Sequence, residues 1–97
     1  MKAMEKSIFT PEYAILREEL VKERTLAGLT QRELARRLKV PHSWVAKVES
    51  GERRIDLIEM CLVLSECGVD PSAVCERLAS QIALMQAKRH RKGKRRR

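Results

Sequence analysis

Three side chains able to form hydrogen bonds with a ligand stand close together in the middle of the sequence: His42, Ser43 and Lys47. On a helix that turns about 100° per residue they share one face, and the apolar residues between them occupy the opposite face. An imidazole, a hydroxyl and an ammonium group offer donors to acceptor atoms and to anions. The chemistry expected of this face is therefore recognition.

The residue sets that enzymes use are missing from the sequence. It has no Ser/His/Asp set on a plausible scaffold, no glycine-rich phosphate loop and no metal-ligand cluster. Cys61, Cys67 and Cys75 are odd in number and form no C-x-x-C pair, so neither a disulfide framework nor a zinc site is indicated. We expect reduced, packing cysteines, with a disulfide between two copies as the alternative. We predict a non-enzymatic protein without a metal or another cofactor.

Positive charge is concentrated at one end of the chain. The net charge is +8, and eight of the 21 Lys and Arg residues lie in residues 88–97, so the remaining 13 balance the 13 acids. A run of like charge without apolar residues cannot bury surface, and we predict a disordered basic tail over 88–97. This tail is either solvated or in contact with phosphate groups.

Composition indicates one helical domain. The chain has 97 residues, only three of them aromatic, and no strand-type runs, which favours an all-α fold. No apolar run approaches the roughly 18 residues that cross a membrane, and the first ten residues lack the apolar core of a signal peptide. We therefore expect a cytoplasmic protein.

Capping residues and helix breakers divide residues 10–87 into five helices, after an N-terminal extension of residues 1–9. Thr30 and Glu33 have the spacing of a capping box, as do Asp56 and Glu59. Glycines follow the first, third and fourth helices, where a left-handed residue is common. The expected helices cover residues 11–27, 31–38, about 41–50, 57–67 and 71–87.

The stretch GLTQRELARRLKVPHSWVAKVESGERR, residues 28–54, resembles the Cro and phage-repressor (Xre) family of helix-turn-helix domains. The resemblance extends over about residues 13–79. It implies a five-helix lambda-repressor-like DNA-binding domain that inserts its third helix into the major groove of double-stranded DNA. Because one short helix reads few bases, we expect a homodimer. We expect it to act as a transcriptional regulator, more specifically as a repressor. Lys39 stands where the family usually has glycine.

The resemblance also implies roles for individual residues. The candidate base-reading residues are Gln31, His42, Ser43 and Lys47. The candidate phosphate contacts are Arg32, Arg53 and Arg54. An ion pair between Arg24 and Glu49 is expected to hold the reading helix in place.

Two questions stay open at the level of sequence. The apolar stripe on the fifth helix is our candidate for the dimer contact, although it could instead pack back on the first helix. Its members are Val74, Leu78, Ile82 and Met85. The same fold could also serve as an antitoxin-like or coactivator-like module whose protein partner carries the activity. A DNA-bound protein would associate with the nucleoid, and no membrane contact is expected.

Overall fold

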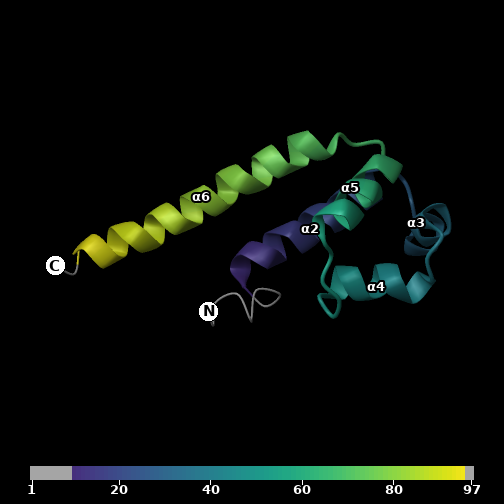
Figure 1. The fold of residues 1–97 in the computed structure, drawn as a ribbon, viewed down its shortest axis with the longest axis horizontal. Helices are drawn as coiled ribbons and strands as arrows, with labels where there is room; N and C mark the ends of the chain where they lie inside the picture. The colour runs from purple at the N-terminus through teal and green to yellow at the C-terminus, as the bar shows by residue number, and fades with distance from the viewer. Residues whose placement is uncertain (1–9, 96–97) are drawn as a thin grey trace.

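The computed structural model describes residues 10–95, and the side chains of residues 10–90. All regular secondary structure in this range is helical (Figure 1), which confirms the all-α fold class. The helices are α2 (Pro11–Leu26), α3 (Gln31–Leu38), α4 (His42–Ser50), α5 (Leu57–Glu66) and α6 (Pro71–Arg95). Among these helices none is long and apolar enough to cross a bilayer.

Helix starts follow the predicted capping residues. The Thr30 hydroxyl accepts a hydrogen bond from the Glu33 backbone N–H at 3.0 Å, and the Glu33 carboxylate accepts one from the Thr30 N–H at 2.8 Å. Asp56 and Glu59 form the same reciprocal pair before α5. Each capping box satisfies two donors near a helix N-terminus, where the backbone has no intrahelical partner. Both predicted capping boxes are confirmed.

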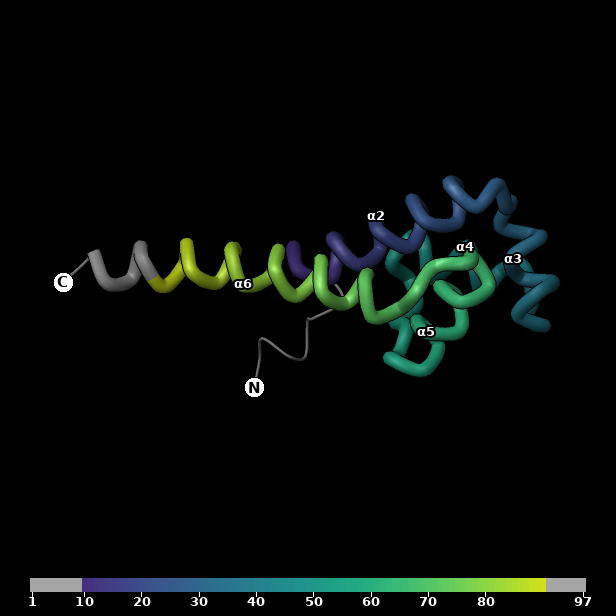
Figure 2. The backbone as a smooth tube through the Cα atoms, turned by 90° about the horizontal axis from the view of Figure 1, so that it is seen from above, coloured from purple at the N-terminus to yellow at the C-terminus, as the bar shows by residue number. Residues whose placement is uncertain are grey.

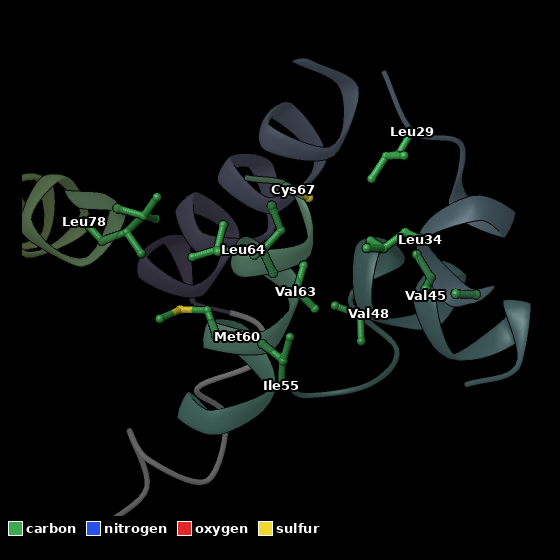
Figure 3. Close-up of a cluster of buried hydrophobic side chains, with 13 residues drawn as sticks. Leu29, Leu34, Val45, Val48, Ile55, Met60, Val63, Leu64, Cys67 and Leu78 are labelled. Atoms are coloured by element: carbon green, nitrogen blue, oxygen red, sulfur yellow. The ribbon is translucent and has the colours of Figure 1, made fainter. Parts of the chain in front are cut away.

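The core lies where α3, α4 and α5 meet, and it continues between α2, α5 and α6 (Figure 3). Its most deeply buried large side chains are Leu34, Leu64, Val45 and Val74. In Figure 3, Val48 of α4 and Val63 of α5 point toward one another. α2 and α5 lie between α4 and α6 (Figure 1), so the short α4 is fixed at one side of the domain and the long α6 at the other.

Helix α6 projects beyond the body of the domain (Figure 2) and is longer than the sequence predicts. Arg77 pairs with Glu19 at 2.7 Å and with Glu23 at 3.1 Å, and Arg89 pairs with Glu12 at 2.6 Å. These contacts hold α6 along α2. The helix continues to Arg95, in contrast to the disordered tail predicted from residue 88. Lys and Arg are good helix formers, and cations near a helix C-terminus interact favourably with its dipole.

Candidate nucleic-acid interface

A three-residue connection joins α3 to α4 and sets their crossing. Ala35 is 2% exposed at the contact, and its carbonyl accepts a hydrogen bond from the Val40 N–H at 3.0 Å. Lys39 ends α3 in the left-handed region, with φ 60° and ψ 44°. Such a conformation favours glycine, which the family usually has at this position. Lys39 adopts the same backbone geometry, and this costs on the order of 1 kcal/mol.

The two faces of α4 are clearly separated. Val45 and Val48 are 1% and 3% exposed and anchor one face in the core. His42, Ser43 and Lys47 are exposed on the other face, as the sequence periodicity predicts. The result is a short helix with a fixed back and a polar, solvent-facing front.

A chain of hydrogen bonds connects this front to α2. Arg24 donates from Nε to Glu49 Oε2 at 2.6 Å and from Nη2 to Glu49 Oε1 at 3.1 Å. The Gln31 amide donates to Glu49 Oε1 at 2.8 Å, and its own Oε1 lies 3.2 Å from His42 Nε2. The last contact is a hydrogen bond when Nε2 carries the proton.

This chain of contacts orients two of the candidate base-reading groups. The hydrogen bonds that the Glu49 carboxylate accepts, together with its negative charge, raise the pKa of Arg24 above its ordinary value. The guanidinium therefore stays charged and holds the carboxylate, whose side chain is only 9% exposed. Because Glu49 in turn holds the Gln31 amide, Gln31 and His42 are positioned before any ligand arrives.

The candidate phosphate residues differ in their surroundings. Arg32 and Arg54 are exposed, and Arg54 lines a small pocket with Thr10 and with Glu12 and Tyr13 of α2. Arg53, in contrast, is engaged in contacts within the chain. It donates to the Glu59 carboxylate at 3.1 and 3.2 Å and lies 4.9 Å from the centre of the Trp44 ring.

Arg53 thus has an internal role. Its hydrogen bonds raise its own pKa and, as the main cause, lower the pKa of Glu59. The guanidinium ties the loop after α4 to the first turn of α5 and covers Trp44. Its charge is compensated by Glu59, and its side chain is 38% exposed. The phosphate contacts of Arg32, Arg53 and Arg54 stay predictions.

Two positioning residues are absent from the sequence prediction. The Tyr13 hydroxyl accepts a hydrogen bond from the Ile55 N–H at 2.9 Å and so anchors the loop between α4 and α5. Arg17 approaches the end of α4, where its Nη1 lies 3.5 Å from the Glu49 carbonyl oxygen. Gly51, at φ 86°, leaves room for Arg17, since an added Cβ would lie 3.0 Å from its Nε. Both contacts join residues more than 30 positions apart, for which a single sequence carries no signal.

The candidate dimer residues of α6 do not form one exposed surface. Val74 and Leu78 are 0% and 9% exposed within the chain's own core, where α6 packs against α2 and α5. Ile82 and Met85 are half-buried, and Ile82 lines a small pocket with residues of α2. For Val74 and Leu78, the alternative prediction therefore holds: this part of the stripe packs back into the chain's own core.

Comparisons with known proteins agree with this geometry. A family model described as helix-turn-helix matches residues 20–74. A solved structure of an "XRE-family like protein from Pseudomonas syringae pv. tomato str. DC3000" is 39% identical, with a TM-score of 0.74. The match covers 81% of this chain and 96% of that chain. No curated protein matches. The family predicted from residues 28–54 is thus confirmed, and the chain belongs to the Xre family of helix-turn-helix DNA-binding regulators.

Proposed function

We propose that this protein is a sequence-specific, double-stranded DNA-binding transcriptional repressor that acts as a homodimer, with α4 as the reading helix. The observation that carries the proposal is the division of α4 into a buried valine face and an exposed face with His42, Ser43 and Lys47. The major groove of B-DNA admits one α-helix and presents acceptors and donors at the base edges.

Each exposed group suits a part of that groove. Within the part of the chain whose side chains are described, no hydrogen bond or ion pair engages the side chains of Ser43 or Lys47, so both are available to a ligand. A lysine ammonium group can donate to guanine O6 and N7, which makes Lys47 the main candidate for base recognition. Ala46 is small enough for the α4 backbone to approach the base edges and could meet a thymine methyl group.

Phosphate contacts would flank the reading helix. The Thr30 hydroxyl takes the Glu33 N–H, so the N–H groups of Gln31 and Arg32 are the ones in the first turn of α3 that, together with the helix dipole, favour an anion near Gln31. Exposed Arg32 and Arg54 add cations on the adjacent surface. Since each neutralised phosphate releases counterions, affinity should fall with salt at a log–log slope of about −0.9 per phosphate.

The proposal is tested by selecting bound sequences from a random double-stranded DNA library at about 150 mM salt, then comparing Lys47→Ala with Lys22→Ala on the selected site. Lys22 is an exposed lysine on α2, outside the reading helix. We expect an enriched palindromic motif. Lys47→Ala should lose about 1–3 kcal/mol of discrimination at one base pair in each half-site, and Lys22→Ala should keep the wild-type preference.

Two results would contradict the proposal. A folded protein that enriches no motif would not be a sequence-specific regulator. If Lys47→Ala weakened binding equally on all sequences, Lys47 would contact phosphate, and the base-reading role of α4 would have to lie with other residues.

A further inference from the structure

The net positive charge of the chain is gathered at the end of α6. The 13 Lys and Arg residues before residue 88 balance the 13 acids, so the whole net charge of +8 belongs to residues 88–97. No Asp or Glu follows Glu76 in the sequence. The helix continues to Arg95 and projects beyond the body of the domain (Figure 2). This cationic segment is therefore presented on a helix that extends away from the core.

Ion pairs with α2 compensate only the inner side of α6, the side that packs against α2. Leu78 is buried and Ile82 is half-buried on this side, and Arg89 is paired there with Glu12 at 2.6 Å. Lys88, one position earlier, is exposed. Among the described side chains no hydrogen bond or ion pair engages Lys88. Its charge is thus free to meet an anion from outside the chain.

Further cations follow Lys88 at helical spacing. Positions 88, 91, 92 and 95 are all Lys or Arg, and residues spaced in this way share one side of a helix. The four positions extend over about 10 Å along the helix axis. One strand of duplex DNA has a phosphate group about every 3.4 Å along its axis, so about three phosphate groups correspond to that length. The segment therefore matches an anion with dense, regularly repeated charge.

The chemistry of α6 fits a nucleic acid better than an anionic membrane. A helix that lies on a membrane inserts a broad apolar face, commonly with Trp, Phe and Leu. In α6 no residue is aromatic, and Leu78 and Ile82 are already used against the body of the domain. Leu84, at 65% exposure, is the one large apolar side chain of α6 among those described that is mostly exposed. Attraction by charge alone favours the phosphate backbone of DNA.

The end of α6 is also well separated from the reading helix. α2 and α5 lie between α4 and α6 (Figure 1). Arg24 of α2 holds α4 through Glu49, whereas Glu12, twelve positions earlier on α2, holds Arg89 of α6. Twelve residues of helix extend over about 18 Å, which corresponds to roughly five base pairs of DNA. Phosphate groups bound at the end of α6 are therefore not those beside α4.

We propose that the end of α6, from Lys88 to Arg95, is a second DNA-contacting element. It binds phosphate groups of double-stranded DNA without regard to base sequence, outside the stretch that α4 contacts. The ion pair between Arg89 and Glu12 holds the start of this element at a fixed place on α2. The inference goes beyond the proposed function, because it requires neither base reading by α4 nor a dimer.

The salt dependence of binding to a random-sequence duplex of about 40 base pairs tests the proposal. Fluorescence anisotropy between about 50 and 300 mM salt would compare the full-length wild type with Lys88→Gln/Lys92→Gln. Lys22→Gln/Arg37→Gln is the matched control, since it removes the same charge from exposed positions on α2 and α3. Gln, Lys and Arg have similar helix propensity, so circular dichroism should show the same helicity in all three proteins.

We expect the α6 variant to have a log–log slope that is shallower by about 1.8, from two lost phosphate contacts at about 0.9 each. Its affinity at about 150 mM salt should fall at least fivefold, and the control should change the slope by less than about 0.5. The preference for a selected site over the random duplex should be unchanged in both variants.

The proposal is overturned if the α6 variant keeps the wild-type slope, or if the control lowers the slope equally, since any cation would then have the same effect. It is also overturned if the α6 variant loses base preference, or if it loses binding only to vesicles of phosphatidylcholine and phosphatidylglycerol. A wild type without preference for any sequence would refute the proposed function alone, because the slope on the random duplex still measures the contact of α6.

Discussion

Replacing Arg24 with methionine should strongly destabilise the domain, because it leaves the Glu49 carboxylate without its cation. The side chains of Arg24 and Glu49 are 15% and 9% exposed, so little water can replace the lost contact. Breaking a buried ion pair by removing one partner costs about 3–5 kcal/mol. Because the Gln31 amide still donates to Glu49 Oε1 at 2.8 Å, we expect a cost at or just below the lower end of this range, about 2–3 kcal/mol.

The double variant Arg24→Met/Glu49→Leu should recover most of that loss. With both charges removed, the site holds two apolar side chains of similar length, an exchange that is often neutral or stabilising. The two single substitutions should therefore be non-additive by about 2 kcal/mol, which identifies a direct interaction between the two residues. Arg36→Met is the matched control, since Arg36 is exposed on α3 and should change stability by less than about 0.5 kcal/mol.

Urea unfolding followed by circular dichroism at pH 7 measures all five proteins. For a domain of this size, a loss of 2–3 kcal/mol lowers Tm by roughly 10–20 °C, so a thermal melt gives an independent check. The reasoning is refuted if Arg24→Met costs less than about 1 kcal/mol, or if the double variant equals the sum of the two singles. Either result would mean that solvent already screens the pair.

Two further predictions concern the backbone and pH. Lys39→Gly should stabilise the domain by about 0.5–1 kcal/mol, because glycine adopts the left-handed conformation without strain. As a control, Lys22→Gly inside α2 should destabilise the domain by about 1 kcal/mol. Urea unfolding measures both variants, and a loss of stability in both would contradict the argument. The pKa of Glu59 is lowered by Arg53, so its carboxylate stabilises the fold at neutral pH and loses this effect as the pH falls below the ordinary Glu value of about 4.3. Stability between about pH 6 and pH 3 should then fall less steeply in Glu59→Gln than in the wild type, and parallel curves would show that Glu59 makes no such contribution.

Local chemistry explains how much of the fold could be predicted from the sequence. Capping boxes act over three residues, and α3 begins and ends where Thr30 and the following periodicity place it. The end of α6 could not be placed in this way. A run of Lys and Arg has high helix propensity but no apolar stripe, and the two signals predict different states for residues 88–95.

In the candidate site too, local features could be predicted from the sequence and contacts that depend on the folded loops could not. The exposed face of α4 follows from helical periodicity, and the nearness of Arg24 to Glu49 was expected from the family resemblance. The pairing of Arg53 with Glu59 was missed because it depends on the path of the loop between α4 and α5. The same residue types in sequence fit both a phosphate contact and an internal ion pair, and only the folded loop distinguishes them.

The hydrogen-bond chain through Glu49 links the stability of the fold to recognition. Glu49 holds the Gln31 amide at 2.8 Å, and Gln31 contacts His42 at the first turn of α4. A change at Arg24, which lies outside the proposed reading face, should therefore alter base preference as well as lower stability, because Glu49 and the Gln31 amide bound to it are no longer held to α2. Lys47 has no contact with this chain of hydrogen bonds, so the base contact proposed for Lys47 should survive the same change. Arg24 thus acts as a positioning residue for one end of the proposed reading face, while the packing of Val45 and Val48 and the contact of Arg17 with the Glu49 carbonyl oxygen hold the other end.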